Sequence, residues 1–173
     1  MSGKYGIGWT NNTNKEFYFD LEDYDLIKDY CWCEDIGSNG YSSIRAKIPN
    51  TTKNTIMAWL IMGEKFYDHI NRNPFDNRKN NLRKATLCEN ARNHDISKRN
   101  TSGFIGVVWS KTNNKWRSRI TVNGQRITLG FFENKEDAIV ARLQAEFKYY
   151  GEFAPQRHLF EQYKINKEKV EDL

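Results

Sequence analysis

The stretch YDHINRNPFDNRKNNLRKAT, residues 67–86, decides how this chain is interpreted. Residues 65–70 can form a strand, and Pro74 with the asparagines around it forces a loop. Residues 82–85 can return as a second strand. The stretch therefore predicts two short strands joined by a long loop.

A helix is expected directly after the second strand. Thr86 and Glu89 form the T-x-x-E pattern of a capping box, which places the helix start at Leu87. Asn90 then lies in the first turns, where the helix dipole favours an anionic group such as a phosphate. The predicted order is strand, long loop, strand, helix.

Two oxygen donors meet if this helix packs across the hairpin, because Asp68 and Asn90 then face each other. Carboxylate and amide oxygens are hard ligands that suit Mg²⁺. His69 follows Asp68 on the strand and points to its opposite side, from where it can reach a water over the open end. His94 is four residues after Asn90, so a continuous helix would offer it on the same face as an additional ligand.

These residues resemble the HNH nucleases of phage homing endonucleases, in the variant whose third motif residue is asparagine. The resemblance covers residues 55–95 and rests on these residues: Asp68-His69, Asn81, Leu82-Arg83, Thr86 and Asn90. It implies a ββα-metal fold with His69 as general base and Asn81 bracing the loop and orienting His69. It also implies one divalent ion, Mg²⁺ or alternatively Mn²⁺, held by Asp68 and Asn90.

The chain departs from this family at one place and leaves one alternative open. Members usually carry His-Arg before the apolar LIM run, where this chain has Ala58-Trp59. The alternative is that Asp68 and His69 are ordinary strand residues and that the asparagines only build turns.

Composition indicates a folded protein with a basic central block. Of the 173 residues, 38% are apolar and 14% aromatic, and no apolar run approaches the roughly 20 residues that cross a bilayer, so we expect an intracellular protein. Three cysteines without paired CxxC knuckles are interpreted as thiols rather than a zinc site. The net charge is +5, yet residues 65–126 contain 14 Lys+Arg against 4 Asp+Glu. Such a block is the electrostatic footprint of a nucleic-acid binder.

The remainder of the chain divides into four further regions. Residues 1–54 predict a small α+β lead-in, with a helix over 21–28 and a hairpin around 37–40. A short helix over 57–62 is expected at the start of the motif region, residues 55–95. Residues 96–102 read as a linker, and residues 155–173 as a polar tail that forms a helix or frays. Residues 103–154 predict a three-stranded antiparallel sheet with Asn123-Gly124 as a hairpin turn, its strands formed by GFIGVVW from residue 103, KWRSRITV and QRITLGFF. A helix from Lys135 to Gly151, capped by Asn134, is expected to follow.

Residues 101–154 resemble the APETALA-type, or ethylene-response-factor-like, DNA-binding domain. The matching segments are SGFIGVVW, KWRSRI, the Asn123-Gly124 turn, ITLGFF and EDAIVARLQAEFKYYGEFA. In that family the sheet enters the major groove of duplex DNA. Ile105 and Val108 stand where plant members have arginines, so the plant recognition sequence is not transferred.

Strand alternation selects the face of the sheet that meets DNA. Arg117, Arg119 and Thr121 share one face of the second strand, while Trp116 lies on the other. The resemblance adds Arg126 and Thr128 to the DNA face. We interpret Lys111 and Lys115 as phosphate contacts, and Trp109 with Trp116 as packing residues. Four cations near the motif would hold phosphate or merely be solvated: Arg72, Arg78, Lys79 and Arg83.

The sequence therefore predicts an α+β protein that acts as a site-specific, metal-dependent DNA endonuclease of the homing type. Duplex DNA is the expected partner, and protein partners are not indicated. The competing hypothesis is a non-catalytic DNA-binding or regulatory protein derived from a decayed HNH nuclease.

Overall fold

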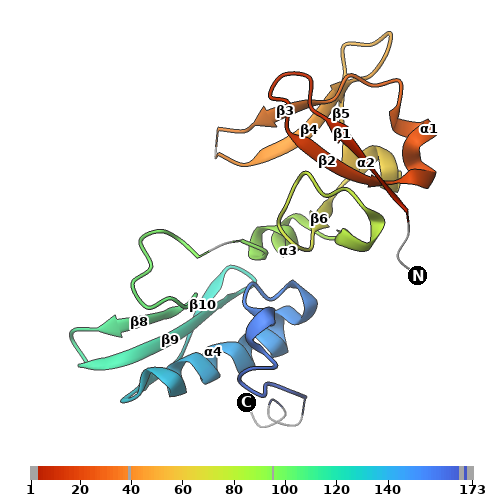
Figure 1. Ribbon diagram of the computed structural model, residues 1–173. Helices are drawn as coiled ribbons and strands as arrows, with labels where there is room; N and C mark the ends of the chain where they lie inside the picture. Colours follow the sequence, from red (N-terminus) through yellow and green to blue (C-terminus); the bar gives the residue numbers. More distant parts are fainter. Residues whose placement is uncertain (1–3, 39, 95, 168–169, 171–173) are drawn as a thin grey trace. The chain divides into compact units, whose positions relative to one another are not determined.

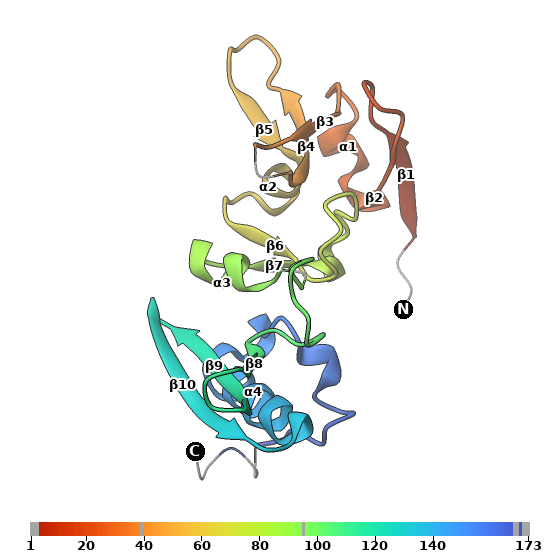
Figure 2. The same ribbon diagram turned by 90° about the vertical axis from the view of Figure 1, so that its left-hand side faces the viewer.

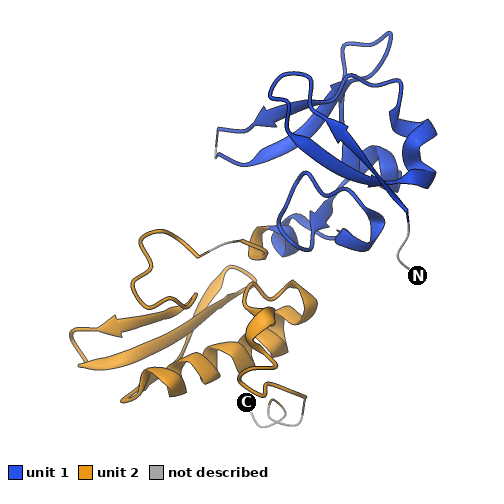
Figure 3. Ribbon diagram, in the orientation of Figure 1, with its two compact units in different colours: residues 1–90 blue, residues 91–173 orange. Residues whose placement is uncertain are grey.

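The protein is described here from a computed structural model that covers residues 4–38, 40–94, 96–167 and 170. Two compact units make up the chain, Met1–Asn90 (unit 1) and Ala91–Leu173 (unit 2), drawn blue and orange in Figure 3. Each unit combines helices with small antiparallel sheets, which confirms the α+β class. Our predicted boundaries lie at residues 54, 95, 102 and 154, whereas the two units divide at residue 90.

Unit 1 contains three small antiparallel sheets, whose strands pair in the orders β1-β2, β3-β4-β5 and β6-β7 (Figure 1). Its elements are β1 (Tyr5–Trp9), β2 (Glu16–Asp20), the 3₁₀ turn η1 (Leu21–Asp23), α1 (Tyr24–Ile27), β3 (Cys33–Ile36), β4 (Ser42–Lys47), β5 (Asn54–Ile56), α2 (Met57–Met62), β6 (Tyr67–His69), the 3₁₀ turn η2 (Lys79–Asn81), β7 (Leu82–Lys84) and most of α3 (Leu87–Arg92), whose last two residues belong to unit 2. The predicted helix over 57–62 and the predicted order of strand, loop, strand and helix are confirmed. Strands β1 and β5 were not predicted.

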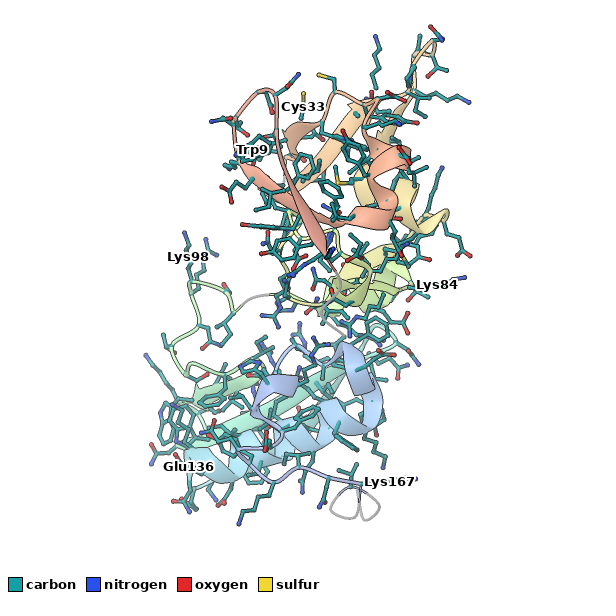
Figure 4. All side chains as sticks on the ribbon, turned by 45° about the vertical axis from the view of Figure 1, so that its right-hand side comes forward. Trp9, Cys33, Lys84, Lys98, Glu136 and Lys167 are labelled. Atoms are coloured by element: carbon teal, nitrogen blue, oxygen red, sulfur yellow. The ribbon has the colours of Figure 1, made fainter. Side chains whose placement is uncertain are left out.

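Strand β1 is shaped by two aromatic rings of β2. Gly6 and Gly8 lie opposite Phe19 and Phe17 in the ladder. An added Cβ would lie 2.4 Å from the Phe19 ring and 2.3 Å from the Phe17 ring. Only glycine leaves room for both rings, which explains the alternating YGIGW sequence. Trp9, labelled in Figure 4, is exposed.

One hydrophobic core joins the N-terminal region to the predicted motif. Its buried members are Phe17, Phe19, Ile27, Trp32, Ile44, Ala46, Met57, Ala58, Ile61 and Leu82, with Phe75 packed against them. Leu82 belongs to β7 and Phe75 to the loop before it. The predicted lead-in and the β6–β7 ribbon are therefore stabilised by the same buried apolar surface.

Unit 2 is a three-stranded antiparallel sheet in the order β10-β9-β8, covered by one long helix (Figure 2). Its elements are β8 (Val107–Ser110), β9 (Lys115–Val122), β10 (Gln125–Phe132), α4 (Lys135–Tyr150) and the 3₁₀ turns η3 (Gly151–Phe153) and η4 (Arg157–Leu159). Asn123 and Gly124 both have positive φ, +50° and +79°, as a type I′ turn requires, so the predicted hairpin is confirmed.

Two local predictions for unit 2 need correction. The first strand starts at Val107 rather than at residue 103, and Ile105 precedes it. The side chain of Asn134 makes no capping hydrogen bond to the helix backbone; its Nδ2 instead lies 3.3 Å from Asp137 Oδ2. Gly151, with φ of +53°, ends α4 as expected.

For the described part of residues 155–173, which ends at 167 apart from residue 170, the prediction of a polar helix or frayed end is wrong; the remaining residues of that prediction lie outside the described part of the chain. Gln156 is 1% exposed and its Nε2 donates to Glu146 Oε1 (2.8 Å), while its Oε1 accepts from the backbone N–H of Ile105 (2.8 Å). Glu146 also binds Arg142, whose Nη1 donates to the carbonyl of Arg119 (2.5 Å). The segment closes a buried polar network that ties α4 to the sheet.

In the part of the chain that the structure covers, no helix has the length and apolar character needed to cross a bilayer.

Candidate active site and DNA-binding face

Asp68 and Arg83 face each other across the β6–β7 ribbon. They are direct partners in the antiparallel ladder, in which His69 lies opposite Leu82. Arg83 donates from Nε (2.9 Å) and Nη2 (2.5 Å) to Asp68 Oδ2. Asp68 is only 3% exposed, so the guanidinium balances a buried charge and holds the carboxylate in one orientation.

His69 is the last residue of β6 and is half-buried. Its Nε2 lies 3.2 Å from Asn77 Oδ1. Burial lowers the pKa of the His69 imidazole, although the hydrogen bond to Asn77 and the charges of Asp68 and Asp76 act in the opposite direction. The ring is therefore neutral near pH 7, which is the form that can accept a proton.

Asn81 closes the loop between the two strands. Its side-chain Oδ1 accepts from the N–H of Asn71 (2.9 Å), and its Nδ2 donates to the carbonyl of Asp76 (2.7 Å). Its own carbonyl accepts from the N–H of Ile70 (2.8 Å). Asn81 is 6% exposed, and its three bonds brace the loop. None of these bonds goes to His69, which Asn81 was also expected to orient.

The loop is also bound to strand β2. Tyr18 donates its N–H to the carbonyl of Phe75 (2.7 Å) and accepts from the N–H of Asn77 (2.8 Å). Asp76, which lies between them, receives Arg78 Nε on Oδ1 (2.7 Å) and Nη2 on Oδ2 (2.8 Å). Burial opposes ionisation of Asp76, but the hydrogen bonds and charge of Arg78 outweigh it and lower the pKa of the carboxyl.

Helix α3 begins at the predicted capping box. Thr86 N–H donates to Glu89 Oε2 (2.8 Å), and Glu89 N–H donates to Thr86 Oγ1 (3.2 Å), so this prediction is confirmed. Asn90 is exposed on α3, which both ribbon views place next to the β6–β7 ribbon (Figures 1 and 2). The amide is thus accessible beside the strand that carries Asp68.

The prediction that His94 lies on the same helical face as Asn90 is wrong. Helix α3 ends at Arg92, and His94 N–H donates to the Arg92 carbonyl (2.9 Å) in the turn that follows. His94 therefore does not continue the face of Asn90.

The donors expected for a metal ion are oxygen atoms. Across the described residues there is no cluster of three or more His, Cys, Asp or Glu side chains suited to a metal. The two residues expected to hold a cation, Asp68 and Asn90, carry one carboxylate and one amide, and oxygen donors of this kind are those that Mg²⁺ prefers. A cation there would share Asp68 with the guanidinium of Arg83.

The cations near the ribbon are engaged within unit 1. Lys79 Nζ pairs with Glu22 (2.5 Å) and Asp23 (2.9 Å), and the hydrogen bonds that it donates to these carboxylates raise the pKa of Lys79 to about 12. Arg78 binds Asp76, and its guanidinium lies 5.3 Å from the centre of the Tyr5 ring. Arg83 is likewise bound to Asp68. Arg72 is half-buried in the loop with a φ of +63°.

Ala58-Trp59, which replaces the His-Arg pair of the HNH family, packs within unit 1. Ala58 is 2% exposed and belongs to the core of unit 1. Trp59 is half-buried, with Lys65 Nζ 5.8 Å from the centre of its ring. The side chain at residue 58 points into apolar surroundings, away from solvent.

The arginines of one sheet face in unit 2 lie close enough to one another for their charges to interact. Here the arginine face means Arg117, Arg119 and Thr121 of β9 with Arg126 and Thr128 of β10. Arg126 lies opposite Thr121 and Thr128 opposite Arg119, so the five side chains share one side of the sheet. Burial lowers the pKa of Arg119, and the neighbouring charges of Arg126, Arg117 and Arg142 lower it further. Arg117 Nε is buried and makes no hydrogen bond to any described residue.

Two lysines were expected to contact phosphate, and two tryptophans were expected to pack. Lys111 is exposed, but Lys115 Nζ pairs with Glu133 (2.9 Å). The rings of Trp109 and Trp116 meet edge to face at 5.4 Å on the side away from the arginine face, which is the geometry of packing residues.

Sequence reasoning missed Asn77 and the partner of Arg83. Asn77 is one of several asparagines in a loop without periodicity, so no local signal separated it from its neighbours. The Asp68–Arg83 pair carried a usable signal, since opposite charges at matched positions of two paired strands attract across the ladder.

Comparison with known proteins finds one partial relative. Protein 3.8 of Escherichia phage T7 is 41% identical over 61 residues, which is 35% of this chain and 50% of that protein. The chain thus spans about half the length of the curated relative it matches. No family model and no solved structure matches the chain.

The lowered pKa of His69 predicts a pH-dependent stability of unit 1. The unfolded chain binds this proton near the ordinary value of 6.5, above the folded pKa, so stability is present above pH 6.5 and falls as the pH drops below it. One proton limits the slope to about 1.4 kcal/mol per pH unit. Urea unfolding between pH 7 and pH 5 should show this loss, and His69→Gln should remove it. The matched change His158→Gln, at an exposed residue of unit 2, should leave the slope intact; a slope that persists in His69→Gln contradicts the assignment.

Proposed function

We propose that unit 1 hydrolyses phosphodiester bonds in duplex DNA with one divalent metal ion, as a site-specific endonuclease of the homing type, while unit 2 holds the DNA. The observation that carries the proposal is the adjacency of Asp68 and His69 on β6, with His69 neutral, half-buried and hydrogen-bonded to a loop that Asn81 braces. A capped helix with an exposed amide lies next to this ribbon.

Each residue has a defined task in this proposal. His69 accepts the proton of the attacking water, because its pKa is lowered and the ring is neutral near pH 7. Asn81 keeps the loop closed around the ring. Arg83 orients the carboxylate of Asp68 and keeps it from swinging towards solvent.

Asp68 and Asn90 would hold the cation, Mg²⁺ or alternatively Mn²⁺, through one carboxylate and one amide oxygen. A divalent ion at this place would supply positive charge to the phosphate and to the leaving oxygen in the transition state. The protein contributes the general base, the orientation of its two oxygen donors and a loop that does not need to reorganise during the reaction.

DNA binding is assigned to the arginine face of unit 2. The cations of unit 1 that have carboxylate partners add little net charge, whereas Arg117, Arg119 and Arg126 repel one another and gain from a polyanion. Threonines between the arginines leave room for hydrogen bonds to phosphates or base edges.

The second candidate is a DNA-binding or regulatory protein without catalysis. One observation favours it: Arg83 already occupies the carboxylate that would bind the metal ion. The buried position of Ala58 weakens the other argument for decay, because a side chain inside the core would not touch substrate.

Plasmid nicking separates the two candidates. We expect cleavage with Mg²⁺ or Mn²⁺ that stops with EDTA and falls by about 10²- to 10⁴-fold in His69→Ala, since the general base is lost. Duplex binding, measured by fluorescence anisotropy, should be unchanged in this variant. His158→Ala serves as the control and should cut as well as the parent. Binding without cleavage under every divalent ion tried would identify the non-catalytic candidate.

The arginine face makes a separate prediction about salt. In Arg117→Ala with Arg119→Ala, affinity for duplex DNA should fall, and the slope of log K against log[salt] should flatten by about 1 to 2, because two phosphate contacts are lost. Lys148→Ala with Lys164→Ala removes the same charge from exposed positions of unit 2 outside the sheet and should retain the parental slope. Equal slopes in all three proteins would place the DNA elsewhere.

A further inference from the structure

Asn77 is buried, and its polar groups have defined partners. It is 1% exposed. Its backbone N–H donates to the Tyr18 carbonyl (2.8 Å), its Nδ2 donates to the Pro74 carbonyl (3.2 Å), and its Oδ1 lies 3.2 Å from His69 Nε2. A carbonyl oxygen only accepts, so Nδ2 must be the atom that faces Pro74. The amide orientation is thereby fixed, and Oδ1 is the atom presented to the histidine ring.

This orientation decides where the proton of a neutral His69 ring resides. An amide oxygen only accepts, so the hydrogen bond forms when Nε2 carries the hydrogen. The other tautomer would set the lone pair of Nε2 against that of Oδ1 in a half-buried site, which is unfavourable. The neutral ring therefore carries its hydrogen on Nε2 and its basic lone pair on Nδ1.

We propose that Asn77 is a positioning residue that fixes His69 as the Nε2–H tautomer, so that Nδ1 is the atom that takes the proton from water. The inference rests on the proposed nuclease function for the identity of the reaction, but the tautomer itself does not depend on it. It assigns orientation of the ring to Asn77 and closure of the loop to Asn81.

Strand β2 acts on the histidine through this residue. Tyr18 fixes the backbone of Asn77 from one side, and the bidentate Asp76–Arg78 pair holds the neighbouring turn. The Arg78 guanidinium lies 5.3 Å from the centre of the Tyr5 ring and 6.0 Å from that of Tyr18. The N-terminal hairpin is thus part of the apparatus that orients the ring.

Nitrogen NMR of the ring tests the proposal on the full, metal-free chain. With ¹⁵N-labelled histidine at a pH where the ring is neutral, His69 should give a protonated Nε2 signal and an unprotonated Nδ1 signal. Asn77→Leu keeps the size of the side chain but has no acceptor, so the two tautomers should mix. Asn77→Asp retains an acceptor and should restore the Nε2–H pattern. Asn80→Leu makes the same change at an exposed loop asparagine and should leave the parental spectrum.

Cleavage kinetics supply the second readout. Asn77→Leu should lower kcat by about 10- to 100-fold, the usual cost of losing a group that orients a reacting residue, with KM for DNA near the parental value. Asn77→Asp should recover part of kcat.

The outcomes distinguish failure of this inference from failure of the proposed function. A parental spectrum with the hydrogen on Nδ1 overturns the inference without any variant, so a variant that fails to fold does not obscure the test. An unchanged Nε2–H pattern in folded Asn77→Leu also overturns it. A parent that shows the expected tautomer and its loss in Asn77→Leu, yet cuts no DNA with any divalent ion, supports the positioning role and rejects the nuclease.

Discussion

Closure of the loop between β6 and β7 is the constraint on which the candidate active site depends. A connection of this length carries little regular structure, and its conformational entropy would spread the ring of His69 over many positions. Asn81 ties the loop to itself, and Tyr18 of β2 ties it to a distant strand. Because Phe17 and Phe75 share the core of unit 1, apolar burial and polar closure reinforce each other. The ring can therefore be neutral, half-buried and oriented at once.

Charge is distributed differently in the structure from what the sequence suggests. The basic block is continuous along the chain, but its first part meets carboxylates: Lys79 binds Glu22 and Asp23, and Arg83 binds Asp68. The second part, around Arg119, consists of guanidinium groups that repel one another. Net attraction for a polyanion is therefore expected mainly at unit 2, while unit 1 uses its arginines to shape a loop.

Local signals predicted local structure, and contacts between distant segments were not predictable. The capping box at Thr86 and the Asn123-Gly124 turn are satisfied within a few residues, so the pattern contains the whole cause. Strand β1 was missed because its glycines have meaning only beside the rings of Phe17 and Phe19. The segment after residue 155 was predicted to be a polar tail. Gln156 is polar, but its side chain is buried and donates to Glu146. Asn77 differs from the other loop asparagines by its contact with His69, which forms only in the folded loop.

The central proposal is that Asp68 and Asn90 hold one cation beside the β6–β7 ribbon, close to the general base His69. Paramagnetic broadening by Mn²⁺ in the ¹⁵N–¹H spectrum of the full chain tests it most directly, because broadening falls off steeply with distance and needs no catalysis. Substoichiometric Mn²⁺ should selectively broaden the amide signals of these three residues, and Mg²⁺ should reverse the effect. Broadening that is uniform, or that centres on other acidic side chains and leaves these three sharp, would contradict the account.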